Sequence, residues 1–187
     1  MTSTDMNLEG VNIAILAENQ YEDLELWYPY YRMKEAGAKV TIVGTGSADV
    51  YRSKHNYEVK VDATVNEIKA EQFDAIIVPG GWAPDYLRRY PNMVEFVRQA
   101  NNKGKVIAAI CHAGSLLVSA DVFRGKTATC FKAIKDDIVN AGAKYVDKEV
   151  VVDGNLVTSR HPNDLPAFCR EIITALSKKV ATEVVSR

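Results

Sequence analysis

Short apolar runs alternate with amphipathic segments along nearly the whole chain. The apolar runs predict buried strands at residues 11–17, 39–44, 75–78 and 106–110. The amphipathic segments predict helices at residues 22–36, 91–101, 112–120 and 134–140, and from about residue 163 onward. Strands that are apolar on both faces indicate a parallel sheet covered by helices on both sides. We therefore expect one α/β domain over residues 1–187, built as a three-layer, flavodoxin-like sandwich with a mainly parallel central sheet.

The remaining segments add detail to this expectation. Residues 48–61 predict an antiparallel excursion or hairpin, and residues 127–130 a short strand. Residues 150–152 and 156–158 flank Asp153-Gly154-Asn155, which predicts a second hairpin. The apolar face of the first helix is expected to hold Leu24, Trp27, Tyr28 and Tyr31, and that of the last helix Leu165, Phe168, Ile172 and Leu176. Asn163 is expected to cap the last helix, and residues 1–9 to form a frayed leader.

Charge and cysteine content exclude several classes of protein. Lys plus Arg is 23 and Asp plus Glu is 24, with no basic run, so a nucleic-acid partner is not expected. No apolar stretch reaches the roughly 20 residues of a membrane helix, and the polar, acidic start differs from a secretion signal. Three cysteines without a Cys-x-x-Cys pair favour neither a disulfide framework nor a zinc site. We expect a cytoplasmic protein with reduced thiols, no membrane contact and no metal.

Cys111 is the strongest candidate for chemistry. It directly follows the apolar strand at 106–110 and precedes a small-residue helix start, His112-Ala113-Gly114-Ser115. This order is typical of a nucleophile elbow, in which a sharp turn exposes the side chain at the edge of the sheet. A helix N-terminus also favours negative charge and so lowers the pKa of a thiol. The alternative is an inert core cysteine, because free cysteine is among the most buried residue types.

Two other loops follow strands that end at the same edge of the sheet. Gly80 and Gly81 follow the strand at 75–78, and the backbone N–H of Gly81 together with that of His112 predicts an oxyanion hole. Glu22 and Glu25 stand at the start of the first helix, and a carboxyl group wedged beside a thiol stays protonated. The alternatives are a plain turn for the glycines and helix-dipole complementation for the glutamates.

The three histidines lead to different expectations. His112 adjoins the candidate nucleophile and is a candidate base of a Cys–His pair, although neighbours at an elbow often point apart. His55 lies in a polar segment and is expected at the surface. His161 lies in a loop before the last helix, where a structural role is favoured over a place at the rim of the site.

Five segments together carry a resemblance to a known family. They read AENQYEDLELWYPYYRMKEAG, IIVPGGWAPD, IAAICHAG, IKDDIVNAGA and VVVDGNLVTSRHPNDLPAFCREI. The chain resembles the PfpI family of intracellular protease-like or amidase-like proteins from about Val11 to Leu176. That family belongs to the class I glutamine-amidotransferase-like superfamily, together with the parkinsonism-associated deglycase.

The resemblance implies a role for each matching residue. Cys111 matches the nucleophile and His112 the neighbouring histidine. Glu25 matches the glutamate that hydrogen-bonds the nucleophile, and Glu22 a second acidic residue of the pocket. Asp85 matches a glutamate that orients the histidine from a neighbouring subunit in PfpI-like hexamers. The resemblance thus implies catalysis without a cofactor in a homo-oligomer, from dimer to hexamer.

The sequence departs from the family pattern at four places, the mildest being Cys111-His112-Ala113-Gly114 in place of Cys-His-Gly-Pro. Phe131 stands where relatives often have tyrosine or histidine, and a phenyl ring cannot transfer a proton. Asp85 is one methylene shorter than the usual glutamate, which weakens a triad formed between subunits. His161 is followed by Pro162 and Asn163 rather than by the His-x-Glu of glutamine amidotransferases, so that activity is disfavoured.

Three functions remain open at this point. The first is a glyoxalase or protein deglycase in which Cys111 adds to methylglyoxal, glyoxal or their adducts as a hemithioacetal. The second is an intracellular cysteine peptidase or amidase that uses Cys111, His112 and Asp85. The third is a redox-sensing stress protein or chaperone that works through oxidation of Cys111.

Overall fold

The computed structural model describes residues 7–185, with side chains described through residue 178. Its centre is a seven-stranded sheet in the order β10-β11-β7-β6-β1-β2-β5. The strands are β1 (Asn12–Ala17), β2 (Lys39–Gly44), β5 (Ala63–Thr64), β6 (Ala75–Val78), β7 (Val106–Ile110), β10 (Val150–Asp153) and β11 (Leu156–Ser159). All neighbours pair in parallel except β10 and β11, which form the predicted antiparallel hairpin.

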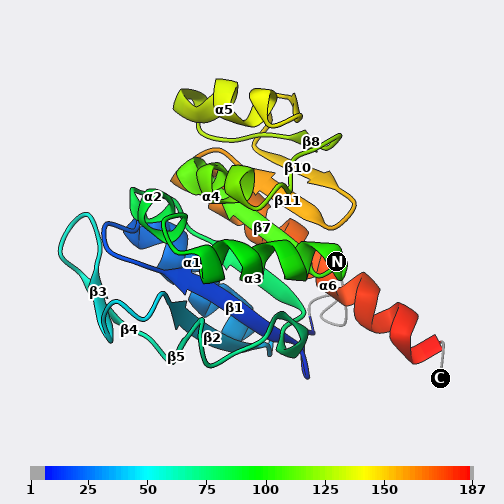
Figure 1. Ribbon diagram of the computed structural model, residues 1–187. Coiled ribbons are helices and arrows are strands. Elements are labelled where there is room, and N and C mark those ends of the chain that lie inside the picture. The colour runs from blue at the N-terminus through cyan, green and yellow to red at the C-terminus, as the bar shows by residue number, and fades with distance from the viewer. Residues whose placement is uncertain (1–6, 186–187) are drawn as a thin grey trace.

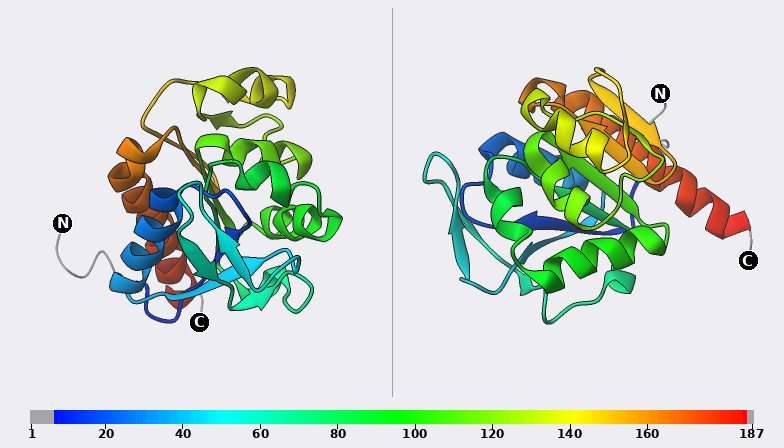
Figure 2. Two further views of the ribbon diagram at one scale, coloured as in Figure 1. Left: turned by 90° about the vertical axis from the view of Figure 1, so that its left-hand side faces the viewer. Right: turned by 45° about the horizontal axis from the view of Figure 1, so that its top comes forward.

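Helices cover both faces of this sheet. Helices α1 (Asp23–Glu35) and α6 (Leu165–Val185) pack on one face, and α3 (Pro91–Asn102) and α4 (Gly114–Ser119) on the other. Figure 1 shows the sheet between these layers, and the left view of Figure 2 separates α1 and α6 from α3 and α4. A hydrophobic core lies on each face of the sheet, and strand β1 contributes residues to both. Ile13 and Ile15 pack in one core, and Ala14 and Leu16 pack in the other. The predicted three-layer, flavodoxin-like fold is confirmed.

The smaller elements lie around this sandwich. The predicted hairpin consists of β3 (Val50–Arg52) and β4 (Glu58–Lys60). The predicted strand at 127–130 is shorter, because β8 (Thr127–Ala128) pairs only with β9 (Lys144–Tyr145). Helix α2 (Ala83–Leu87) follows β6, and α5 (Lys135–Asn140) follows β8. Short 3-10 turns are η2 (Ala70–Gln72), η3 (Cys111–Ala113), η4 (Lys132–Ile134) and η5 (Pro162–Asp164). Because η5 includes Asn163 and α6 begins at Leu165, the expected cap at Asn163 is wrong.

The first helix is correctly placed but its buried face was wrongly predicted. Leu24, Tyr28 and Tyr31 are 57%, 40% and 62% exposed. The buried face of α1 instead carries Glu25, Leu26, Pro29 and Met33. Within the predicted stripe, Trp27 stacks on Tyr31 near the surface, and Trp27 also contacts Tyr57 of the hairpin loop. This rotation of the helix points Glu25 inward. In α6, by contrast, all four residues of the predicted stripe are buried.

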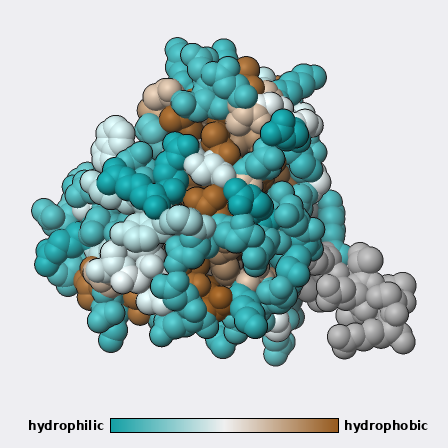
Figure 3. Space-filling model, viewed as in Figure 1, coloured by the Kyte–Doolittle hydropathy of each residue, from teal (hydrophilic) through white to brown (hydrophobic). Residues whose placement is uncertain are grey.

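The expected leader lies partly outside the described residues, since residues 1–6 are not among them. Leu8, however, is fully buried, and its N–H donates to the Ala36 carbonyl at 2.7 Å. The expectation of a frayed segment through residue 9 is therefore wrong for Leu8, which packs on the core below α1. Within residues 7–185, no helix is both long and apolar enough to cross a membrane. Figure 3 shows a mostly hydrophilic face, with hydrophobic residues visible in small separate areas.

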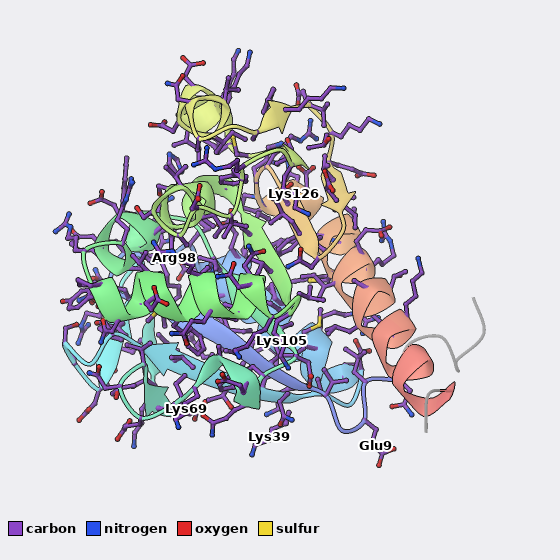
Figure 4. All side chains as sticks on the ribbon, turned by 45° about the vertical axis from the view of Figure 1, so that its right-hand side comes forward. Glu9, Lys39, Lys69, Arg98, Lys105 and Lys126 are labelled. Atoms are coloured by element: carbon purple, nitrogen blue, oxygen red, sulfur yellow. The ribbon has the colours of Figure 1, made fainter. Side chains whose placement is uncertain are left out.

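The amino-terminal edge of the sheet is closed by paired polar groups. Asp74, just before β6, accepts the Asn12 N–H at 3.0 Å and lies 3.7 Å from the Lys105 ammonium. Asn155 donates to the Asn101 side chain and the Lys105 carbonyl, at 3.0 and 2.9 Å. Lys105 is labelled at this edge in Figure 4. The carboxyl ends of β1, β6 and β7 lie at the opposite edge, and the loops that follow them carry the predicted site.

Candidate active site

Cys111 occupies a strained turn directly after β7. Its φ is 61°, in the left-handed region that non-glycine residues rarely adopt, whereas the preceding Ile110 is extended. The Cys111 carbonyl accepts the N–H of Phe131 at 3.2 Å, which ties the turn to the segment after β8. This strained strand-to-helix geometry confirms the predicted nucleophile elbow.

Gly80 and Gly81 bring a second backbone segment against the elbow. A Cβ atom on Gly80 would lie 2.5 Å from Glu25 Oε2 and 2.7 Å from Cys111 Cβ. Gly81 has φ 75° and forms an isolated bridge with Tyr21, where a Cβ would meet the Gln20 carbonyl oxygen at 2.4 Å. Both positions require glycine, because a Cβ atom would collide with the Glu25 side chain, Cys111 or the backbone after β1. A plain turn would not require this close packing.

Glu25 is a fully buried carboxyl group beside the sulfur. Its Oε2 accepts the Gly80 N–H at 2.7 Å, while its Oε1 has no hydrogen-bond partner among the described residues. Burial raises the pKa of Glu25 to about 8, and the nearby Glu22 adds to the rise. The carboxyl group is therefore mostly protonated at neutral pH, as expected. Complementation of the helix dipole does not explain a buried, neutral side chain.

The ionisation of Cys111 differs from the sequence expectation. Burial raises the pKa of the Cys111 thiol to about 12, and the Glu25 carboxylate contributes to this shift. The expected net depression of the pKa is wrong, because the rise caused by burial outweighs the lowering by the backbone N–H groups at this turn. Cys111 thus rests as a thiol, and a thiolate requires a nearby group that accepts its proton.

Two backbone donors converge on the sulfur. The N–H groups of His112 and Gly81 both hydrogen-bond Cys111 and pull the pKa of its thiol downward, against the larger effect of burial. The same pair was expected to form an oxyanion hole. Both donors lie next to the sulfur, and their role as an oxyanion hole stays a prediction.

His112 points toward the nucleophile rather than away from it. Its Nδ1 lies 3.4 Å from Cys111 Sγ, and its ring packs between Trp82 and Phe131 with centroid distances of 5.5 and 4.9 Å. Burial lowers the pKa of His112, and the Lys54 ammonium lowers it further. A neutral imidazole at this distance can accept the thiol proton. Phe131 supports the imidazole ring by packing, a role that needs no proton transfer.

The other predicted residues lie at different distances from the sulfur. Glu22 lines the cavity and its Oε2 accepts from the Lys54 ammonium at 2.7 Å. Asp85 is exposed on α2 and pairs with Arg89, so it does not orient His112 within one chain. His161 reaches the rim after all, because it lines the cavity that contains Cys111. His55 is exposed, as expected.

The cavity at the elbow has a volume of about 190 Å³. Besides the predicted residues it is lined by Lys54, Trp82, Phe131 and Pro162. No local sequence signal marks Lys54 as a site residue, because it comes from a polar surface segment that the β3–β4 hairpin brings to the cavity. Trp82 directly follows the Gly80-Gly81 pair, and that adjacency is a signal that could have identified it.

One group near the entrance has the composition of a metal site. Glu22, Asp23 and His55 each offer a ligand atom, and these atoms lie within 4.8 Å of one another. Asp23 already accepts from Ser53 at 2.6 Å and contacts the His55 ring at 2.6 Å, while Glu22 is paired with Lys54. These side chains satisfy one another, and nothing in the cluster points to a metal ligand.

Comparisons with known proteins agree with this geometry. Residues 11–175 match the DJ-1/PfpI family. The chain is 45% identical to Deglycase PfpI of Pyrococcus furiosus over 166 residues, which are 89% of this chain and 99% of that protein. It is 45% identical to Protein/nucleic acid deglycase 2 of Escherichia coli over 166 residues, 88% of this chain and 96% of the relative.

A solved structure gives the same result for the fold. The crystal structure of Drosophila melanogaster DJ-1beta superposes with a TM-score of 0.83 at 26% identity, covering 94% of this chain and 97% of that one. The elbow around Cys111 is consistent with the sequence match and the shared fold. This chain therefore belongs to the DJ-1/PfpI family.

Proposed function

We propose that this protein is a cofactor-independent enzyme that acts on reactive carbonyl compounds, as a glyoxalase or deglycase, through a hemithioacetal on Cys111. One observation carries the proposal. A partly buried thiol lies among a protonated carboxyl group, a neutral imidazole and two backbone donors, in a cavity of about 190 Å³. A cavity of this volume suits a small dicarbonyl better than a peptide.

The first step follows from these contacts. His112 Nδ1 takes the thiol proton of Cys111, and the sulfur adds to the aldehyde carbon. The carbonyl π electrons move to oxygen, and the N–H groups of Gly81 and His112 stabilise the resulting oxyanion. Glu25 holds a proton that can neutralise this oxygen, because burial keeps its carboxyl group protonated.

The later steps are an internal redox reaction. Glu25 or His112 removes the proton from the former aldehyde carbon, and a proton is returned at the neighbouring carbon. The first carbon is thereby oxidised to a thioester and the second reduced to an alcohol, so no external oxidant is needed. Water then cleaves the thioester, which releases a 2-hydroxy acid and returns a proton to the Cys111 sulfur. Addition to a glycated amine is the deglycase form of the same chemistry.

The relatives support this class of reaction, since two proteins of 45% identity carry deglycase names. A peptidase or amidase that uses Cys111 and His112 needs a third group for His112. Asp85 pairs with Arg89 within the chain, so that group would have to come from another copy. Assembly into a homo-oligomer, a catalytic role for Asp85 between copies and redox sensing by Cys111 remain predictions.

The experiment is turnover of methylglyoxal, with 2-hydroxy acid measured as product. We expect Cys111→Ser to lower kcat/KM by about 10³-fold or more, because an alcohol is a far weaker nucleophile near neutral pH. Cys169→Ala is the matched control. Its thiol lies on the buried face of α6, outside the residues that line the cavity, and the variant should retain turnover.

Two outcomes would contradict the proposal. Equal turnover by wild type and Cys111→Ser would remove the cysteine from the mechanism. Absence of product from methylglyoxal and glyoxal, together with an acyl-enzyme on Cys111 after incubation with peptide amides, would favour the peptidase.

A further inference from the structure

A second cavity lies beside the Cys111 cavity. Its volume is about 470 Å³, against about 190 Å³ for the cavity at the elbow. Phe131 and His161 line both of them, so the two spaces adjoin across these side chains. The mechanism above uses only the smaller space. The larger one falls in the range of volumes that bind small molecules.

The charged groups around the second cavity are mostly cationic. Lys132, Lys135 and Arg160 line it, with Asp147 as the single lining carboxylate. Arg160 is already neutralised, because it pairs with Asp147 at 2.7 Å and with Asp164 at 2.8 Å. The ion pair with Arg160 also neutralises Asp147, the one carboxylate that lines this cavity.

The positive charges of Lys132 and Lys135 are not neutralised in the same way. Neither Lys132 nor Lys135 forms an ion pair with any described side chain of the protein. The Lys135 ammonium lies 5.2 Å from the ring centroid of Tyr145, another lining residue, so it stands over one wall of the cavity. The cavity therefore has room for a ligand and two ammonium groups without an anion to match them.

We propose that this second cavity binds an anionic group, phosphate or carboxylate, of the same substrate whose carbonyl group adds to Cys111. This inference rests on the proposed function, and it narrows the substrate class to carbonyl compounds that carry an anion a few bonds from the reacting carbon. The carbonyl end would occupy the small cavity, and the anionic end would pass Phe131 and His161 to reach Lys132 and Lys135. Binding energy from such a remote group can orient the reacting end.

Direct binding tests the cavity apart from catalysis. Glycerol 3-phosphate, glycerate and glycerol are titrated by calorimetry into wild type and into Cys111→Ser. We expect the anionic probes to bind both proteins and glycerol to bind neither. Phosphate and carboxylate sources are distinguished by which of the two anions binds more tightly.

Variants then assign the binding to the lysines. Lys132→Gln/Lys135→Gln should weaken the anionic probe by about tenfold or more, the usual cost of losing charge-assisted contacts. Lys144→Gln/Lys148→Gln removes the same charge from exposed lysines outside the cavity lining and should leave binding unchanged. Equal weakening by both pairs, or no binding of either anion to wild type, would overturn the inference.

Turnover tests the link to Cys111. The ratio of kcat/KM for hydroxypyruvaldehyde phosphate to that for methylglyoxal should fall by about tenfold or more in Lys132→Gln/Lys135→Gln. An unchanged ratio would refute the shared substrate. If wild type turns over neither compound while anion binding still depends on the two lysines, the proposed function fails and the anion site stands alone.

Discussion

The two edges of the central sheet are built in opposite ways. At the amino-terminal edge, Asp74, Asn12 and Lys105 satisfy one another. At the carboxyl-terminal edge, Cys111 adopts φ 61° and the Glu25 carboxyl is buried with one oxygen unpartnered among the described residues. The first edge thus holds relaxed, paired polar groups. The second holds strained backbone and a carboxyl group whose charged form is disfavoured.

This difference separates the stability of the fold from its chemistry. Strained dihedral angles and unpaired buried groups persist only where the surrounding structure enforces them. Here the parallel sheet supplies that enforcement, because β1, β6 and β7 end side by side and press three loops together. Substitutions at the two edges should therefore have different effects, and the following experiments measure that difference.

The largest expected effect is on the pH dependence of stability. Glu25 has a folded pKa of about 8, above its ordinary value of 4.5, so the folded state holds a proton that the unfolded state releases. Stability from this group is complete below the unfolded pKa and is lost as pH rises toward the folded pKa. The loss between pH 5 and pH 8 is about 3.5 kcal/mol.

Urea unfolding of wild type and Glu25→Gln across this pH range isolates the group, because other titrations cancel in the difference. Relative to wild type, the glutamine variant should gain stability as pH rises. A difference that does not change with pH would show that Glu25 is not a buried, protonated carboxyl group.

The next largest effect is expected from replacing one glycine at each edge of the sheet by alanine and measuring stability and turnover. Gly80→Ala places a Cβ against Glu25 and Cys111. It should destabilise the protein by about 3 kcal/mol through overpacking. It should also lower turnover by about 100-fold, because the reacting groups are displaced.

Gly104→Ala is the control at the amino-terminal edge. Its φ is 65° and a Cβ there meets nothing within 4 Å. It should cost about 1 kcal/mol through backbone strain alone, with turnover unchanged. Thermal unfolding and kcat/KM of both variants give the comparison, which fails if the two alanines affect turnover equally.

The smallest effect concerns the ion pair of the amino-terminal edge. Lys105→Met removes the partner of Asp74, whose carboxylate keeps the Asn12 N–H. Because the pair is partly exposed, we expect a loss of about 0.5 kcal/mol in urea unfolding, with normal turnover. A loss of turnover in this variant would show that the two edges are coupled.

Much of the fold follows from local sequence. Strands β6 and β7 begin and end where the apolar runs do, because a fully buried strand is marked by its composition. The two-residue strands β5 and β9 were not predicted, since such short segments become strands only through their partners. The buried face of α1 was mispredicted because Glu25 and Pro29 occupy it, and neither counts as a hydrophobic residue.

The site was predictable in outline but not in its electrostatics. The elbow at Cys111 and the two glycines have local signals in strand ends and small residues. The contribution of Lys54 depends on how the β3–β4 hairpin folds over the pocket. The state of the Cys111 thiol depends on how deeply the sulfur is buried, and burial outweighs the helix effect that the sequence suggests. The desolvation of the Cys111 thiol arises from the packing of the whole fold, and residues adjacent in sequence do not determine it.

The left-handed backbone at Cys111 also limits which amino acids can serve there. A β-branched side chain is a severe outlier at positive φ, so threonine, the nucleophile of some other hydrolases, is incompatible with this turn. Only reactive side chains that are unbranched at Cβ fit, such as those of cysteine, serine and aspartate. The backbone path thus restricts the reaction chemistry open to any descendant of this sequence.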